Sequence, residues 1–252
     1  IMLYATYSEG YRDGSYAARF TGAVPDPLPN YDPEFVTNYE VGMKSTLLDG
    51  RMRLNASLFR MDYEDMQINA SSDVVTTSST KANLGDATIS GLEVEMSALL
   101  TERLTVSANL GLLDDEIDSL KGMLVSNTVV IDKSSDLPNT PDWTLSLMAK
   151  YEVPLASGAR LAFRADYAVK DEYYSRAENI KETLIDDYRN LNVSASFVSA
   201  DAAWEVIVGA RNATDEVYYQ SATPFATFGL SFGQPVRPRH FYGTVTYTFG
   251  SE

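Results

Sequence analysis

Two adjacent segments of the sequence decide the fold: "ISGLEVEMSALL" at residues 89–100 and "RLTVSANLGL" at residues 103–112. In both, apolar residues occupy every second position, and small or polar residues fill the positions between them. The apolar positions are Leu92, Val94, Met96 and Ala98 in the first segment, and Leu104, Val106, Ala108 and Leu110 in the second. This period of two predicts β-strands with one apolar face, and the short link between the segments predicts an antiparallel hairpin.

The same alternation recurs along most of the chain. It is present in the opening stretch and in the segment that follows Arg51. It continues in "VTNYEVGMKSTLL" (36–48), "DWTLSLMAKYE" (142–152), "RLAFRADYAVK" (160–170), "NLNVSASF" (190–197), "WEVIVGARN" (204–212) and the closing "RPRHFYGTVTYTFGSE" (237–252). With the first two segments, this predicts about ten strands and an all-β fold.

The connections between these strands alternate between short and long. The short ones, "LLDGR", "LLTER", "VPLASGAR" and "VSADAAW", have the composition of tight turns. The long ones cover about residues 11–33, 65–80, 114–140, 171–187 and 214–236. An antiparallel meander with turns at one end and loops at the other is typical of a transmembrane β-barrel, and strands of about ten residues are long enough to cross a bilayer.

The distribution of charge indicates which face meets lipid. In most strands the apolar face carries no charge, and a Lys or Arg on a lipid-facing midplane position costs roughly 2–4 kcal/mol. Aromatic residues near the ends of these faces predict interfacial girdles: Tyr39, Trp143, Tyr151, Phe197, Trp204, Tyr247 and Phe249. The segment after Arg51 is the exception, because its apolar face runs into Arg60 and Asp62; either Arg60 lies beyond the hydrocarbon, or a bulge changes the phase.

Composition excludes several classes of protein. Hydrophobic residues make up 44% of the 252 residues, which argues against disorder. The net charge of -15 argues against a nucleic-acid partner, and the absence of cysteine excludes disulfides and thiolate metal sites. No apolar run approaches the length of a transmembrane helix. The chain opens without a signal peptide and as if inside a strand, so we expect a partial chain.

Several phrases together resemble the C-terminal half of the TonB-dependent outer-membrane receptors. They are "LYATYSEGYRDG", "YEVGMKSTLLDGRMRLNASLFRMDYEDMQ", "ISGLEVEMSALLTERLTVSANLG", "VGARNATDEVYYQ" and the terminal "YTF". The most specific are the "N-x-T-D-E-x-Y-Y" run and the "G-x-E-x-E" strand opening. The resemblance implies a 22-stranded barrel filled by a plug domain. Residues 1–252 would then be the C-terminal portion of the barrel, with the plug and the N-terminal strands absent from this chain.

The resemblance also implies a function and a location. Such a receptor is integral to the bacterial outer membrane. It binds a scarce nutrient (a metal chelate, corrinoid or glycan) at extracellular loops, and an inner-membrane TonB complex drives uptake. Its partners would be outer-membrane lipid and lipopolysaccharide, the missing strands and plug, and a small-molecule or glycan ligand. We expect no enzymatic activity, no cofactor and no metal site.

The long segments hold the candidate ligand-binding residues. Aromatic side chains with hydroxyl groups suit sugar rings or chelates, and the candidates are Tyr11, Tyr16, Tyr31, Tyr173, Tyr174, Tyr218, Tyr219 and Phe225. Phe20, Phe228 and Phe232 belong to the same clusters, and packing of the loops against themselves is the alternative role. The long segments also carry nearly all of the chain's net negative charge, which favours neutral or cationic cargo over strongly anionic ferric siderophores.

Polar faces of the strands would line the lumen. Their charged residues, of mixed sign, suggest an ion-paired wall that contacts the plug: Glu40, Lys44, Glu93, Glu95, Lys150, Arg164, Asp166, Glu205 and Arg211. His240 is the only histidine and has no motif around it. Three alternatives stay open. One is a self-contained ten-stranded barrel acting as an omptin-like enzyme, with Asp187 or Asp215 beside His240. The others are a passive porin and a soluble β-protein.

Overall fold

One antiparallel sheet of ten strands dominates the structure. The computed structural model describes residues 1–16, 30–71, 79–121, 125–126, 129–225 and 230–249. Along the sheet the strands are β1 (Met2–Arg12), β4 (Glu34–Leu47), β5 (Met52–Glu64), β8 (Ala87–Leu99), β9 (Leu104–Ile117), β12 (Trp143–Pro154), β13 (Arg160–Lys170), β16 (Tyr188–Val198), β17 (Trp204–Arg211) and β20 (His240–Tyr247). Each strand pairs with its neighbours in chain order, which confirms the predicted meander.

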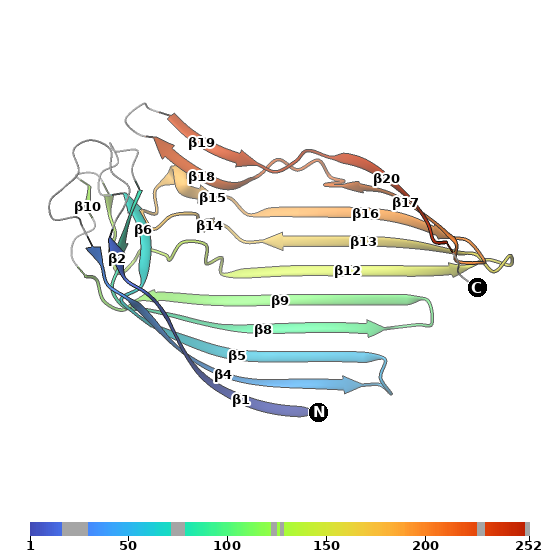
Figure 1. Cartoon of the computed structure of the whole chain (residues 1–252), viewed down its shortest axis with the longest axis horizontal. Helices are drawn as coiled ribbons and strands as arrows, with labels where there is room; N and C mark the ends of the chain where they lie inside the picture. The colour runs from blue at the N-terminus through green and yellow to red at the C-terminus, as the bar shows by residue number, and fades with distance from the viewer. Residues whose placement is uncertain (17–29, 72–78, 122–124, 127–128, 226–229, 250–252) are drawn as a thin grey trace.

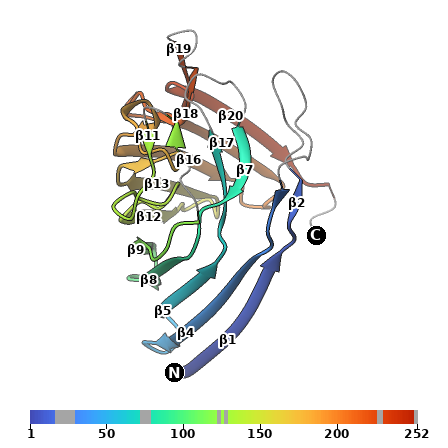
Figure 2. The same ribbon diagram turned by 90° about the vertical axis from the view of Figure 1, so that its left-hand side faces the viewer.

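The sheet is curved and open (Figures 1 and 2). Over the residues described, β1 pairs with β4 alone and β20 pairs with β17 alone, so these two strands form free edges. In hydrocarbon, unpaired backbone groups at such an edge cost several kcal/mol each. This topology contradicts the alternative of a ten-stranded barrel closed on itself.

Short and long connections lie at opposite ends of the sheet (Figure 1). The long connections contain small two-stranded hairpins, which the sequence did not predict. They are β2 (Ser15–Tyr16) with β3 (Asn30–Tyr31), β6 (Gln67–Ser71) with β7 (Ser79–Asn83), β10 (Val125–Ser126) with β11 (Val129–Val130), β14 (Tyr173–Tyr174) with β15 (Leu184–Ile185), and β18 (Tyr219–Phe225) with β19 (Leu230–Pro235). A 3-10 helix, η1 (Lys181–Thr183), precedes β15. In the described part of the chain, no helix is long and apolar enough to cross a membrane.

The strand register places the apolar residues in continuous rows on one face. One row runs across five strands through Val41, Leu58, Leu92, Leu112 and Trp143. These side chains are not a hidden core, because Val41 and Leu58 keep 55% and 56% of their surface exposed. An apolar surface of this size on a water-soluble protein would be a severe liability, so the arrangement supports the predicted lipid-facing role.

The second half of the sheet repeats this arrangement. Leu145, Phe163, Val193 and Val206 belong to the same apolar face by register. Phe163 is 51% exposed and Val193 37%. A soluble sandwich or barrel would have gathered such residues into a shared interior. The structure therefore contradicts the alternative of a soluble β-protein.

The segment after Arg51 needs no bulge. Its pairing with β4 runs without a shift from Met52 to Glu64, so Arg60 and Asp62 stay on the apolar face. Arg60 pairs with Tyr39 across the strands, and its Nε lies 2.8 Å from Oδ1 of Asp62. The ion pair lies near the long-loop end of the strand, level with an aromatic residue of the predicted girdle. This supports the first of the two explanations, that Arg60 lies beyond the hydrocarbon.

Aromatic residues gather near both ends of the apolar face. At the short-turn end, the ring of Tyr247 lies 4.7 Å from that of Trp204 and 4.6 Å from that of Phe249, between centroids. Near the long-loop end, Tyr7 and Tyr39 lie 5.5 Å apart. Two such bands are the expected interfacial girdles of a membrane barrel.

Two glycines on the polar face hold aromatic rings that cross from a neighbouring strand. A Cβ atom added to Gly42 would lie 2.4 Å from the ring of Tyr4, and one added to Gly209 would lie 2.7 Å from the ring of Tyr242. Each glycine is directly paired with its tyrosine in the register. The missing side chain therefore makes room for a ring to lie across the sheet, as in other sheets where an aromatic residue covers a glycine.

The packed core of the molecule lies in the loop layer. It consists of Met66, Ile68, Leu84, Ala87, Ile117, Ile131, Leu137 and Ala177, contributed by three different long connections and the ends of β8 and β9. Ala87 and Ile117 pair with each other on the polar face. The long connections therefore fold inward over this face, and β7 lies inside the curve of the sheet (Figure 2). The polar face is the lumenal one.

Candidate functional site

A recess of about 550 Å³ lies at the long-loop end of the polar face, between the ends of β16, β17 and β20 and the hairpin of β18 and β19. Its lining combines stacked aromatics, amides and cations: Ala168, Tyr188, Asn190, Asn192, Arg211, Asn212, Tyr218, Gln220, Gln234, Pro235, Val236, Arg237 and His240. We call it the upper recess. Its size and mixed lining are typical of a small-molecule site.

Asn212 organises the loop side of the upper recess. It is 2% exposed and takes a left-handed backbone conformation with φ of 48°, which asparagine tolerates better than most residues. Its Nδ2 donates to the carbonyls of Glu216 (2.8 Å) and Arg237 (3.2 Å), and its Oδ1 accepts from the backbone N–H of Glu216 (2.9 Å). Asn212 and Glu216 belong to the "N-x-T-D-E-x-Y-Y" run, so the most specific phrase in the sequence shapes this recess.

A pair of stacked tyrosines forms one wall. The rings of Tyr188 and Tyr218 lie 4.0 Å apart between centroids and 2° from parallel. Nδ2 of Asn190 donates to the hydroxyl of Tyr218 (3.1 Å), which fixes the position of that ring. Beside the pair, the Tyr173 hydroxyl donates to the carbonyl of Gln220 (3.3 Å). Burial raises the pKa of Tyr173, so this hydroxyl stays protonated as a donor.

The upper recess is basic although the chain is acidic. Arg211, Arg237 and His240 line it, and none of the described lining residues is Asp or Glu. The guanidinium of Arg211 lies over the ring of Tyr242, 5.6 Å from its centroid, and this cation–π contact stabilises its position. The excess of acidic residues in the long segments predicted cargo that is neutral or cationic. That prediction does not describe this recess, because Arg211 and Arg237 come from segments far apart in the sequence and meet only in the fold.

The eight candidate ligand-binding residues are spread widely, and their binding role stays a prediction. Tyr218 lines the upper recess, and Tyr173 contacts the loop beside it. Tyr219 follows in β18 and packs on Gly233. Tyr174 lies in β14, and Phe225 lies in β18, where its backbone pairs with that of Leu230.

The other three candidates lie on β1 and the first long connection. Tyr11 is in β1 itself, on the apolar outward face, with its ring 6.4 Å from that of Phe35, a position that suits an interfacial girdle. Tyr16 is exposed, and Tyr31 receives Lys81 over its ring at 5.6 Å. Phe20 and Phe228 fall outside the described residues, and Phe232 lies in β19.

Sequence reasoning missed several residues of the upper recess. Tyr188 was not a candidate, although it is an aromatic residue on the polar phase of a strand, directly paired with Lys170. An aromatic side chain on a lumenal face is the signal that could have identified it. Arg237, Gln220 and Gln234 gave no comparable signal, because their place depends on how the last long connection folds back.

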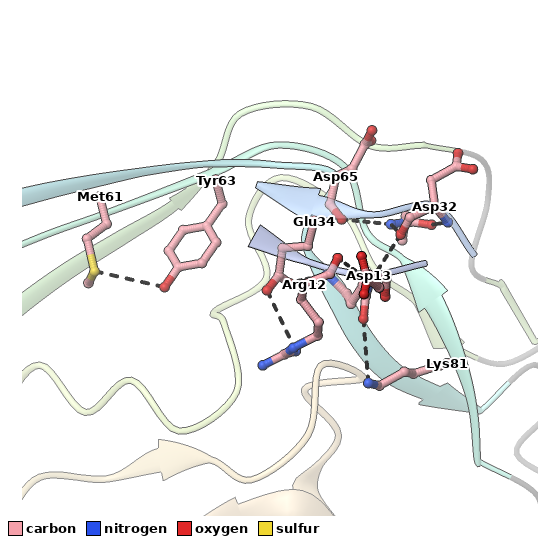
Figure 3. Close-up of polar contacts among 10 residues, drawn as sticks. Arg12, Asp13, Asp32, Glu34, Met61, Tyr63, Asp65 and Lys81 are labelled. Atoms are coloured by element: carbon pink, nitrogen blue, oxygen red, sulfur yellow. Dashed lines mark hydrogen bonds and ion pairs between the residues drawn. The ribbon is translucent and has the colours of Figure 1, made fainter. Parts of the chain in front are cut away.

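A second polar cluster ties the first two long connections together (Figure 3). Glu34 is buried, accepts from the backbone N–H of Gln67 (2.6 Å) and lies 3.6 Å from Arg12. The side-chain amide of Gln67 donates to the carbonyls of Asp13 and Asp32, both at 3.0 Å. Each of these groups has a partner within the cluster, which therefore acts as a structural clasp between loops.

The third and fourth long connections are clasped in the same manner. The Asn179 side chain accepts from the backbone N–H of Asp136 (2.6 Å) and donates to its carbonyl (3.0 Å). Burial, with repulsion from Asp115 and Asp142, raises the pKa of the Asp136 carboxyl. The protonated carboxyl is therefore favoured in the fold. Its contribution to stability is fully present below the unfolded pKa of Asp136 and is lost as the pH rises through the folded pKa.

A further recess of about 210 Å³ lies on the lumenal wall at β1, β4, β5 and β8. Its lining is mostly acidic and polar: Tyr4, Glu40, Lys44, Asn55, Ala56, Ser57, Glu93 and Glu95. The Tyr4 hydroxyl donates to Glu40 at 2.5 Å, and Nδ2 of Asn55 donates to Glu95 at 3.3 Å. Glu93 and Glu95 come from the "G-x-E-x-E" strand opening, which thus forms an acidic patch inside the lumen.

The structure offers little support for catalysis at His240. Its Nδ1 lies 3.1 Å from the carbonyl of Pro238, which can only accept a hydrogen bond. Asp215, a suggested partner, accepts instead from the backbone N–H of Arg239 at 2.8 Å. Over the described residues, no group of three or more His, Cys, Asp or Glu side chains could hold a metal ion.

Comparison with known proteins decides the family. A model of the family described as "TonB dependent receptor-like, beta-barrel" matches residues 1–213. The chain belongs to the TonB-dependent receptor family. This match confirms the resemblance seen in the sequence, and with it the predicted all-β fold of an outer-membrane receptor barrel. Like its relatives, this TonB-dependent receptor chain belongs to an integral outer-membrane protein.

Individual relatives of this TonB-dependent receptor chain agree. A siderophore receptor of Acinetobacter baumannii, PiuA, is 23% identical over 76% of the chain and 24% of its own length. The ferric yersiniabactin uptake receptor FyuA from Yersinia pestis superposes over 98% of the chain with a TM-score of 0.75 and 18% identity. The copper transporter OprC superposes over 98% with a TM-score of 0.69 and 18% identity. The chain spans about a quarter of the length of PiuA and 35% of the FyuA chain.

Proposed function

We propose that this TonB-dependent receptor chain is the C-terminal portion of a barrel that takes up an anionic metal chelate. Residues 1–252 would supply about ten of 22 strands, and the remaining strands and the plug would lie in parts of the protein outside this chain. The open edges at β1 and β20 support this division, because both need partners in a membrane. An inner-membrane TonB complex would supply the energy for uptake.

The upper recess is the observation that carries the proposal. Two guanidinium groups favour carboxylate, catecholate or similar oxygen anions, and the stacked pair of Tyr188 and Tyr218 offers a flat surface beside them. Amide groups of Asn190, Gln220 and Gln234 can hydrogen-bond to the rest of a ligand.

The relatives have compatible names. They include a catecholate siderophore receptor, Fiu, of Escherichia coli, 27% identical over 52% of the chain, and a metal-pseudopaline receptor, CntO, of Pseudomonas aeruginosa, 28% identical over 48%. Both names describe receptors for metal chelates. A corrinoid or glycan, the other predicted cargoes, has no such support among these relatives.

The acidic recess of β1 to β8 would face the plug. Glu40, Glu93 and Glu95 present carboxylates inside the lumen, where an anionic cargo is repelled and a basic segment is attracted. We propose this wall as a plug contact, as the sequence suggested for the lumenal charges.

Binding to the full-length receptor tests the proposal. The receptor containing this chain is expressed in a strain without other ferric-chelate receptors, and radioiron-labelled ferric tris-catecholate is the probe. Substituting Arg211→Gln or Arg237→Gln should weaken equilibrium surface binding about tenfold or more, because each removes a charged hydrogen-bond donor worth roughly 1.5–3 kcal/mol.

Arg53→Gln is the matched control. Arg53 is exposed near the short-turn end of the polar face, paired with Ser97, and lies outside the upper recess. It should leave binding unchanged. Failure of the unaltered receptor to bind the probe, or equal effects of all three substitutions, contradicts an anionic chelate as the ligand of this recess.

A further inference from the structure

A third recess of about 340 Å³ adjoins the upper recess on the lumenal wall, and we call it the lower recess. The two share Ala168 and Asn192 as lining residues, so they are continuous along β13 and β16. The lower recess is further lined by Ser107, Asn109, Ser146 and the pair formed by Arg164 and Asp166. It lies deeper in the barrel, toward the short-turn end.

The register shows how the two recesses connect. Arg211 pairs with His240 in the upper row, and Gly209 pairs with Tyr242 in the next lumenal row. Consecutive residues on one face of a strand lie about 7 Å apart along the strand. The lower row continues from Tyr242 and Gly209 through Ser194 to Arg164, and then to Lys150 on β12. Arg211 in the upper recess is thus followed, one step deeper, by Arg164 in the lower row, while Lys150 beyond it is ion-paired with Glu152.

The two halves of the lumenal wall differ in charge. On β1 to β8, the recess that contains Glu40, Glu93 and Glu95 has Lys44 as its one cation among the described lining residues. On β12 to β17, the exposed guanidinium of Arg164 forms an ion pair with Asp166, with Nη2 at 2.5 Å and Nε at 2.7 Å from its carboxylate oxygens. An anion leaving the upper recess would therefore meet less repulsion along β13 and β16 than along the opposite wall.

We propose that the lower recess is a second, transient binding position for the anionic chelate on its way through the barrel. The inference rests on the proposed function of the upper recess. Arg164 is the recognising group, and Asp166 competes with the chelate for it, so binding there is weak enough for the cargo to leave. Passage through a pore requires sites of this kind, which are favourable to enter yet easy to leave.

Opposite effects of two charge-removing substitutions test the proposal. Arg164→Gln should leave surface binding of ferric tris-catecholate unchanged but lower energised uptake about tenfold, the effect of losing one charged hydrogen bond. Asp166→Asn frees the same guanidinium, so uptake at a limiting probe concentration should stay at or above that of the unaltered receptor. A purely structural ion pair predicts equal losses for both, because each substitution breaks it.

A further variant keeps the ion pair and blocks the space. Ser146→Phe fills the lower recess, and it should reproduce the loss of uptake with unchanged surface binding even where Arg164→Gln reduces the amount of receptor in the outer membrane. Three results would overturn the second position. The first is unchanged uptake in Arg164→Gln and Ser146→Phe, and the second is equal losses of uptake in Arg164→Gln and Asp166→Asn. The third is a loss of surface binding that parallels the loss of uptake. Failure of the proposed function is distinct, because Arg211→Gln would then leave surface binding intact.

Discussion

Replacing Leu147 by lysine is expected to destabilise the folded receptor by roughly 2–4 kcal/mol, because it places a charge on the lipid-facing side of a membrane-spanning strand. Leu147 lies near the middle of β12, pairs with Ala108 and Tyr167, and is 42% exposed on the apolar face. The measurement is chemical unfolding of the full-length receptor in lipid vesicles. A loss of this size should also reduce the amount of receptor assembled in the outer membrane.

Ser146→Lys is the control, one residue away on the opposite face. Ser146 is exposed and lines the lower recess, so a lysine there remains in contact with the lumen. Its free energy of unfolding should change by less than about 1 kcal/mol, as for most exposed substitutions. Equal destabilisation by both lysines would mean that the two faces of β12 do not differ in environment.

Gly209→Val is expected to cost about 1–3 kcal/mol of unfolding free energy, the usual range for overpacking. The ring of Tyr242 occupies the space above Gly209, and a Cβ there would come within 2.7 Å of it. The ring must rotate away or the strands must separate, and the contact between Arg211 and Tyr242 would be lost. Chemical unfolding of the receptor in lipid vesicles measures this loss of stability. The fluorescence of a label attached in the upper recess reports the displacement of the Tyr242 ring.

Gly243→Val gives the matched control on the neighbouring strand. The nearest atom to a Cβ at Gly243 is the carbonyl oxygen of Ile207 at 3.8 Å, an ordinary contact. Gly243 lies on the outward face, paired with Val208, where a larger apolar side chain meets lipid. Stability should be unchanged or slightly increased. A similar cost for both valines would show that valine is disfavoured at both positions for reasons unrelated to Tyr242.

The strands and their faces could be predicted from the sequence because each is encoded locally. A strand that crosses a membrane must keep charge off every second position, so the alternation in segments such as 160–170 specifies both the element and its orientation. The segment after Arg51, which forms β5, follows the same rule. Arg60 stays on the apolar face because the register of β5 is unbroken, and a local pattern cannot show where the hydrocarbon ends.

The loops and the candidate site could not be predicted in the same way. The hairpins in the long connections depend on contacts between connections, such as that of Asn179 with Asp136, which leave no periodic trace. Net charge was misleading for a related reason. The acidic residues dominate the count, but the fold brings Arg211 and Arg237 together in one recess.

The most direct test of the account is the environment of alternate residues along one strand. Residues 1–252 contain no cysteine, so single cysteines at positions 145 to 149 of β12 can each carry a nitroxide spin label once any cysteine elsewhere in the full-length receptor is replaced. In the full-length receptor reconstituted in lipid, labels at Leu145, Leu147 and Ala149 should be relaxed by oxygen, which concentrates in hydrocarbon. Labels at Ser146 and Met148 should respond instead to a water-soluble nickel complex. A reversed pattern, or equal accessibility at all five positions, would contradict an outward-facing apolar surface and with it the placement of both recesses in the lumen.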